Sequence, residues 1–159
     1  MRDGQREMVL TEVAESVGKG FFAGLAGTAA ITASMAAEAK LRNKELPPVQ
    51  ADAVEKVVGV EPRGEKEKRL LANLVHWQYG TAWGGVRGLL AALGLRAPAA
   101  TLVHFVLVSS AAGVMLPALG LAPPPTKQPP LEVGMSALHH LLFAGVTTAV
   151  FEYLDSHPA

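Results

Sequence analysis

The 159-residue sequence predicts an all-α integral membrane protein: a four-helix transmembrane bundle of two tandem helical hairpins, preceded by a short N-terminal amphipathic helix. Four apolar segments are long enough to cross about 30 Å of hydrocarbon, for which a helix needs roughly 20 residues. They lie at about 20–39, 70–95, 98–121 and 133–154. Two long stretches, 21–37 and 97–126, contain no charged residue. Half of all residues are hydrophobic (50%), and the mean hydropathy is +0.27.

Composition narrows the class of protein further. The 14 basic and 14 acidic residues balance to a net charge of zero, which gives no sign of a nucleic-acid-binding surface. The chain has no cysteine, so disulfides, thiolate catalysis and cysteine-based metal sites are excluded. Its length fits a single membrane domain that spans residues 1–159.

The N-terminal segment 1–16 carries several charges before any apolar run, which is unlike a secretory signal peptide. Val9, Leu10, Val13 and Val17 fall at helical spacing on one face. This pattern predicts a short amphipathic helix on the membrane surface, with a soluble tail as the alternative. The first span then serves as an uncleaved anchor.

The loop 40–69 is the longest polar segment and carries eight of the 14 basic residues. Positive charge marks the cytoplasmic side of a membrane protein, so this loop and the loop 122–131 are predicted to be cytoplasmic, with both termini outside. Arg2, Arg6 and Lys19 favour the opposite orientation. Within the loop, the spacing of valines over 54–58 predicts one short amphipathic turn.

The order of elements repeats along the chain. In each predicted hairpin a proline-rich loop leads to a span with histidine near its start: Pro47 and Pro48 precede His76, and Pro123 precedes His139. The two hairpins could pack about a pseudo-twofold axis along the membrane normal, or they could resemble each other by accident.

Glycine spacing predicts how the first two spans pack. Gly80, Gly84 and Gly88 recur every four residues and therefore form one ridge of a helix, on which His76 also lies. A matching stripe in the first span, mostly at spacings of three and four, consists of Gly20, Gly24, Gly27, Ser34 and Glu38. We expect these small-residue faces to contact each other.

Counting residues from the loop 40–69 places several polar side chains at a similar depth. These are Glu38, His76, Gln78, His139 and His140. Ionisable groups inside spans are costly and usually face a partner or a cavity. The cluster is interpreted first as an interhelical hydrogen-bond network. A proton relay is the second interpretation, and ligation of haem or another metal by two facing imidazoles is the third. No cofactor is predicted.

A second polar pair, Arg87 and His104, is predicted at one depth near the other side of the membrane. Arg87 is expected to extend toward the lipid headgroups rather than to form an anion site, with Glu152 as a possible partner. Pro117 is expected to bend or end the third span.

Several short motifs resemble a known family. They are Gly24-Leu25-Ala26-Gly27-Thr28, Leu46-Pro47-Pro48, His76-Trp77-x-Tyr79-Gly80 with Gly84, Leu116-Pro117, and the start of the last span around His139. Together they resemble the YagU-like family of small bacterial inner-membrane proteins. The resemblance implies a multi-pass inner-membrane protein connected with acid tolerance, and it supplies no catalytic residue. Arg87 departs from it, because an aromatic or apolar residue is expected there.

No phosphate-binding loop, catalytic triad or paired carboxylates at catalytic spacing are visible, so we expect a non-enzymatic protein. The expected function is that of an accessory, structural or stress (acid-tolerance) factor in the bacterial inner membrane. Its partners would be the lipid bilayer and either other copies of itself or other membrane subunits, without nucleic acid. One alternative is a small proton or solute conduit lined by Glu38, His76 and His139. The other is a haem- or metal-binding subunit that uses His76 and His139.

Overall fold

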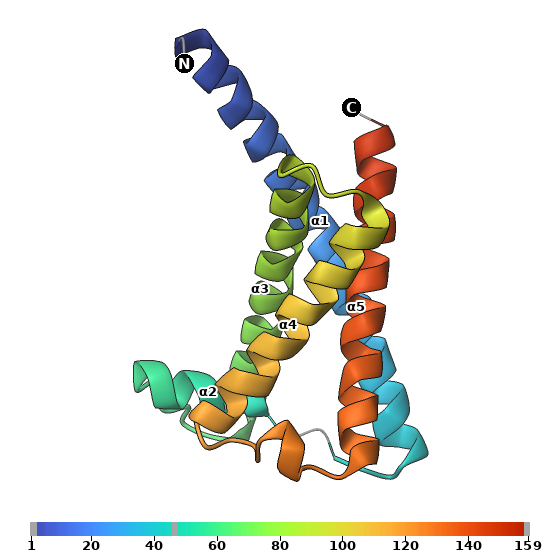
Figure 1. Ribbon diagram of the computed structural model, residues 1–159. Helices are drawn as coiled ribbons and strands as arrows, with labels where there is room; N and C mark the ends of the chain where they lie inside the picture. The colour runs from blue at the N-terminus through green and yellow to red at the C-terminus, as the bar shows by residue number, and fades with distance from the viewer. Residues whose placement is uncertain (1–2, 46–47, 158–159) are drawn as a thin grey trace.

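The computed structural model describes residues 3–45 and 48–157, and the regular secondary structure of these residues is α-helical apart from one short 3-10 helix. The elements are α1 (Asp3–Leu41), α2 (Val49–Val58), α3 (Glu65–Ala92), α4 (Ala97–Ala118), η1 (Pro125–Lys127) and α5 (Pro130–Ser156). The four long helices α1, α3, α4 and α5 run lengthwise, each antiparallel to the next along the chain (Figure 1). This confirms the predicted all-α class.

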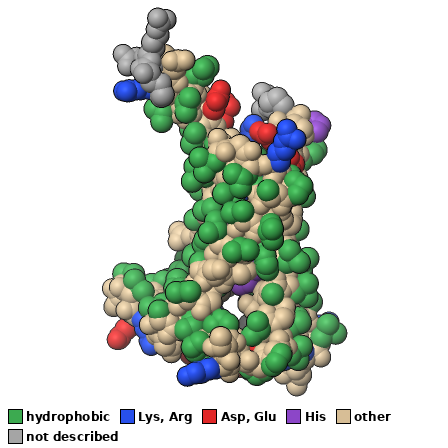
Figure 2. All heavy atoms as spheres, in the orientation of Figure 1, with side chains coloured by type: hydrophobic (Ala, Val, Ile, Leu, Met, Phe, Trp, Pro, Cys, Tyr) green, Lys and Arg blue, Asp and Glu red, His purple; other side chains and the backbone are tan. Residues whose placement is uncertain are grey.

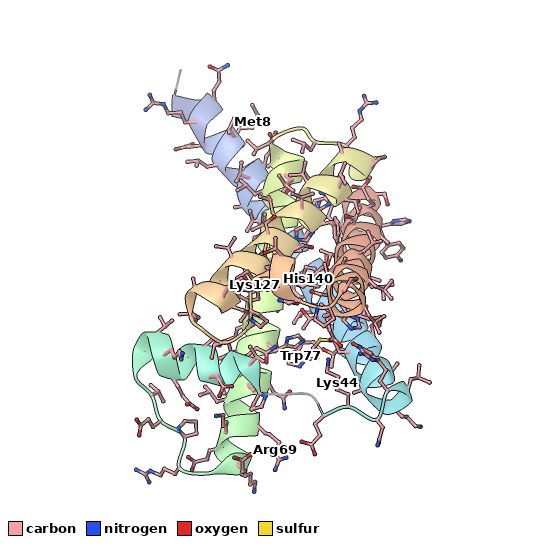
Figure 3. The ribbon with its side chains drawn as sticks, turned by 60° about the horizontal axis from the view of Figure 1, so that its bottom comes forward. Met8, Lys44, Arg69, Trp77, Lys127 and His140 are labelled. Carbon is pink, nitrogen blue, oxygen red and sulfur yellow. The ribbon has the colours of Figure 1, made fainter. Side chains whose placement is uncertain are left out.

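The two ends of the molecule differ in what they carry. The start of α1, the α3–α4 connection and the end of α5 lie at one end, which we call the terminal end (Figure 1). The opposite end, which we call the loop end, holds α2, η1 and the connections around them. Lys44, Arg69 and Lys127 lie at the loop end, away from Met8 (Figure 3).

Three helices are long and apolar enough to cross a membrane, and they include three of the four predicted spans: Gly4–Leu41, Ala97–Ala118 and Pro130–Ser156. The helix α3 is not apolar enough to be counted with these three. Its mean hydropathy is lowered by polar side chains, which include Asn73, His76, Gln78 and Arg87. It nevertheless lies beside α1 in the bundle.

The N-terminal amphipathic segment is not a separate helix, so that prediction is wrong. The 39 residues of α1 form one continuous helix, whose length is about 58 Å at 1.5 Å per residue. No proline interrupts it, and a glycine inside a helix costs only about 1 kcal/mol. Its first turns project beyond the bundle, where Met8 and Leu10 are exposed (Figure 1). Residues 1–2 lie outside the described part of the chain.

The helices α2 and α4 end close to the glycine and proline residues that predict a helix end. The helix α4 ends one residue after Pro117, which confirms that this proline ends the span. The predicted amphipathic turn in the polar loop is confirmed as α2, which stops at Gly59 in the left-handed region (φ 73°). Leu46 and Pro47 of the Leu-Pro-Pro motif lie outside the described residues.

Glycines hold α1 and α3 in backbone contact, as predicted. A Cβ atom added at Gly24 would lie 2.8 Å from the Cα of Gly84, and one at Gly88 would lie 2.8 Å from the Cα of Val17. Gly20 and Gly80 belong to the same interface. Such contact allows only glycine, because any side chain would push the two backbones apart.

Ser34 and Glu38 of the predicted stripe contact His139 of α5 rather than α3. Gly27 is a third exception. It faces α5 rather than α3, and a Cβ atom there would lie 3.0 Å from the ring of Phe143 and also meet the hydroxyl of Thr147. The long first helix therefore has two packing faces, one for α3 and one for α5. The small apolar core beside it contains Ile31, Val108 and Phe143.

Candidate functional site

A cavity of about 830 Å³ opens to the surface at the loop end, where it is lined by α1, α3, α4 and α5 together with α2 and the α4–α5 connection. Its walls are largely apolar and include Ile31, Met35, Trp83, Val108 and Phe143. Figure 2 shows the surface hollowed between α4 and α5, with a histidine side chain at the edge of the opening. Its volume lies within the roughly 300–1,000 Å³ of small-molecule sites.

The divergence of α4 and α5 creates this cavity. Near the terminal end the two helices meet, and the Thr101 hydroxyl donates a hydrogen bond of 2.9 Å to the Thr148 hydroxyl. Toward the loop end they separate (Figure 1). The α4 residues that face the space there include Ala112 and Gly113, which are too small to fill it.

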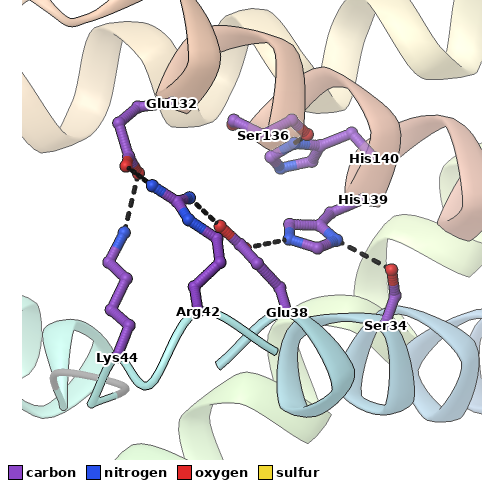
Figure 4. A network of polar contacts seen from close by, with 8 residues as sticks. All are labelled: Ser34, Glu38, Arg42, Lys44, Glu132, Ser136, His139 and His140. Carbon is purple, nitrogen blue, oxygen red and sulfur yellow. Dashed lines mark hydrogen bonds and ion pairs between the residues drawn. The ribbon is translucent and has the colours of Figure 1, made fainter. Parts of the chain in front are cut away.

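A network of polar side chains lines the mouth of the cavity and joins the end of α1 to the start of α5 (Figure 4). The Glu38 carboxylate lies 2.8 Å from Nε2 of His139. The other ring nitrogen of His139, Nδ1, lies 2.9 Å from the Ser34 hydroxyl. Both nitrogens of this buried imidazole are therefore engaged, which fixes the orientation of its ring.

Arg42 extends the network outward. It follows the last residue of α1 and pairs with Glu38, four residues earlier, and with Glu132 of α5 at 2.6 Å. Lys44 lies 2.7 Å from the second oxygen of Glu132. Hydrogen bonds with Glu132 and then Glu38 raise the pKa of Arg42 above its ordinary value. Two cations and two carboxylates thus neutralise each other at the mouth. We name these five residues, Glu38, Arg42, Lys44, Glu132 and His139, the mouth network.

His76 lies at the same end of the bundle as His139, in agreement with the depth counted from the sequence, and it also lines the cavity. Its Nε2 is 3.0 Å from the Thr32 hydroxyl, and its Nδ1 is 3.4 Å from the amide nitrogen of Gln50 in α2. Among the described residues it shares no hydrogen bond with Glu38 or His139. The predicted cluster is therefore two groups around one cavity.

The two remaining members of the predicted cluster, His140 and Gln78, lie on different sides of the bundle wall. His140 lines the cavity, and its Nδ1 donates a hydrogen bond of 2.8 Å to the carbonyl of Ser136 in its own helix (Figure 4). The placement of Gln78 in the cluster is wrong. It lies two residues, or about 200° of helical rotation, beyond His76, and it lines a shallow outer groove with Phe21 and Trp77.

Arg87 does not extend to the headgroups as expected, because its side chain is 0% exposed inside the bundle. Its Nε donates a 3.2 Å hydrogen bond to the Thr148 hydroxyl, and its Nη2 lies 2.5 Å from a Glu152 oxygen. The guanidinium carbon stands 4.3 Å from the centre of the Phe151 ring. A buried cation requires such partners, so Glu152 is confirmed as the partner of Arg87.

His104 is also fully buried, but it shares no hydrogen bond with Arg87 in the described structure. Its ring lies between those of Trp83 and Phe143, with centroid distances of 6.3 and 5.5 Å. Neither of its ring nitrogens has a side-chain partner among the described residues, and the backbone of Trp83 is the polar group that lies closest to meeting one of them. The predicted polar pair is thus two neighbouring buried groups with different surroundings.

Sequence reasoning did not predict the hydrogen bonds of the hydroxyl residues that complete these networks, although Ser34 was expected on a packing face. Ser34, Thr32, Thr101 and Thr148 each contact one of the polar side chains above or one another. Hydroxyl side chains in apolar spans often bond to their own helix, so their presence alone does not identify a partner on another helix.

The haem or metal alternative would use His76 and His139, whose ring nitrogens all lie near hydrogen-bond partners in this structure. His139 already uses both ring nitrogens. Among residues 3–45 and 48–157, no group of three or more histidine or acidic side chains is placed to hold a metal ion.

Comparison with protein-family models, curated proteins and solved structures found no match to this chain.

Proposed function

We propose that the chain is a four-span protein of the bacterial inner membrane, with α3 as the fourth span. Three helices have the required length and apolar character. Because Gly80, Gly84 and Gly88 hold α3 directly against α1, both helices occupy the same depth. The Arg87 side chain on α3 is buried inside the bundle, where it does not contact lipid. The polar loop 40–69 would then be cytoplasmic.

We infer that its function is to bind a small amphipathic molecule in the cavity, as a non-enzymatic accessory or stress factor. The observation that carries this proposal is the cavity of about 830 Å³, with apolar walls and a polar mouth. The charged groups of the mouth network pair with one another. They are not aimed at a point in the cavity where a bound molecule would react. Such a site suits binding better than catalysis. Membership of the YagU-like family and a role in acid tolerance remain proposals that the motifs support.

Tryptophan fluorescence tests the binding site. Trp83 lines the cavity, whereas Trp77 lies in the outer groove, so a Trp77→Phe background makes Trp83 the only reporter. A brominated single-chain fatty acid, titrated into the protein in mild detergent, should quench Trp83 saturably. Gly113→Leu should weaken this quenching, because its side chain would enter the cavity beside Pro125 and take up part of the space for the probe.

The matched control is Gly145→Leu, which introduces the same side chain in α5 where a Cβ atom meets nothing within 4 Å. It should leave the quenching of Trp83 unchanged. If Gly113→Leu and Gly145→Leu bind the brominated probe equally well, the cavity is not the binding site. Quenching of Trp83 that never saturates would point to detergent-like partitioning and would also contradict the proposal.

A further inference from the structure

One polar side chain lies on the outer surface of the bundle at the depth of the hydrocarbon. Gln78 is exposed and lines the outer groove between α1 and α3. Two residues further along α3, a Cβ atom added at Gly80 would meet the Thr28 side chain. Thr28 lies near the middle of the uncharged stretch 21–37. In the proposed four-span topology, on which this inference rests, Gln78 therefore faces the middle of the lipid layer.

Lipid offers the Gln78 amide no hydrogen-bond partner. The amide carries two N–H donors and a carbonyl acceptor, and none of the hydrogen bonds among the described residues uses them; the amide that reaches His76 is that of Gln50. Lipid tails neither donate nor accept hydrogen bonds, and the side chain is too short to reach the headgroups across half of a layer about 30 Å thick. Polar side chains in such positions bond across helices, so Gln78 requires a second protein surface.

The surface around Gln78 fits a neighbouring helix. Leu74, Ala82 and Leu89 lie four, four and eleven residues from Gln78, so the four side chains share one stripe of α3, and all four are exposed. Ala82, one turn from the amide, is small enough for another helix to approach closely. Beside the stripe, Trp77 is 38% exposed in the wall of the groove. We name Leu74, Gln78, Ala82 and Leu89 the Gln78 face.

A second copy of the chain meets the requirements of this face. Two copies inserted in the same direction, and related by a twofold axis along the membrane normal, carry Gln78 at the same depth. An amide both donates and accepts, so two identical amides can bond to each other reciprocally. A different membrane protein would need a polar group at that same depth, and an acyl chain has none.

We propose that two copies of the chain associate through the Gln78 face, with the Gln78 amide of each copy hydrogen-bonded to the partner's Gln78. His76, which lines the cavity, lies about 200° of helical rotation from Gln78. The interface therefore faces away from the cavity, and the mouth network stays accessible in the dimer. Each copy keeps its own binding site.

Disulfide cross-linking in liposomes tests this proposal. The chain has no cysteine, so Ala82→Cys on the Gln78 face provides one reporter per copy. After oxidation with copper–phenanthroline, which enters the lipid, we expect a disulfide-linked dimer on a non-reducing gel. Leu107→Cys is the matched control, because Leu107 is 41% exposed at the middle of α4. It reports random collision and should give little dimer.

A second change separates the amide contact from apolar contact alone. Cross-linking of Ala82→Cys over a series of protein-to-lipid ratios gives the association constant of the dimer. Adding Gln78→Leu should lower this constant about fivefold or more, because the interhelical hydrogen bonds are lost. Since Gln78 is exposed, the change should leave thermal unfolding in detergent and the quenching of Trp83 as they are in the parent chain.

Three results would overturn the proposal. The first is cross-linking of Ala82→Cys no stronger than that of Leu107→Cys, and the second is an unchanged association constant with Gln78→Leu. The third is a conjugate of Ala82→Cys with a different protein, and no dimer, after oxidation of cell membranes. Failure of the binding proposal would instead appear as unsaturable quenching of Trp83. Failure of the topology would appear as thiol labelling of both ends of α3 from one side of the membrane.

Discussion

Single residues at the terminal end show why a buried charge is difficult to place from sequence. Arg87 could be assigned to a depth by counting, but its burial depends on Glu152 and Thr148, which lie more than 60 positions away in the chain. A long basic side chain near the end of a span usually reaches the headgroups. Here the partner carboxylate, Glu152, is half-exposed at the terminal end of α5. Its ion pair with Arg87 keeps the guanidinium inside the bundle.

This geometry predicts an asymmetric response to removal of the two partners. Glu152→Gln leaves the buried guanidinium without its carboxylate and should lower stability by about 1–2 kcal/mol, less than for a fully buried pair because Glu152 is 49% exposed. The double change Arg87→Met with Glu152→Gln should recover part of this loss. Thermal unfolding in detergent measures both. Asp52→Asn, which breaks the surface pair with Lys68 far from Arg87, is the control and should cost less than Glu152→Gln. A double variant less stable than Glu152→Gln alone would contradict this account.

At the scale of helices, local spacing predicted the packing faces better than it predicted their partners. The four-residue glycine repeat identified the face of α3 that contacts α1, because that spacing is a property of one helix. It could not show that Gly27 faces α5, since the neighbour depends on how the whole bundle is arranged. The placement of Gln78 failed for a simpler reason. Depth was counted along the helix, while rotation about its axis was not.

The glycine contact predicts a steep dependence on side-chain size. Gly84→Ala should destabilise the fold, because a Cβ atom there would lie 2.6 Å from the backbone nitrogen of Gly24. Gly84→Leu should cost about 3 kcal/mol or more, as the two helices must separate. Gly145→Leu, on an open face of α5, should change stability by no more than about 0.5 kcal/mol. Thermal unfolding of the three variants decides the matter, and equal small effects for Gly84→Leu and Gly145→Leu would exclude the glycine face as a packing contact.

At the scale of the whole molecule, hydropathy predicted the long helices, and charge counting predicted two unlike ends. Apolar length and basic loops are averages over many residues, so they survive errors in individual positions. The cavity was not predicted, because it arises from the angle between α4 and α5 and from small residues such as Gly113. The continuity of α1 was missed because its change from a charged to an apolar surface was interpreted as a break in the backbone.

The proposed topology predicts that exposed positions alternate between the two sides of the membrane. The chain contains no cysteine, so single substitutions report accessibility without background. Glu61→Cys and Thr126→Cys lie at the loop end, whereas Arg96→Cys and Ser156→Cys lie at the terminal end, and all four positions are exposed. An impermeant thiol reagent should label the last two in intact cells and the first two only after permeabilisation. The reverse labelling pattern would show that the orientation in the membrane is opposite to the one proposed. Labelling of Glu61→Cys and Arg96→Cys from the same side would show that α3 does not cross, since α3 alone separates these two positions.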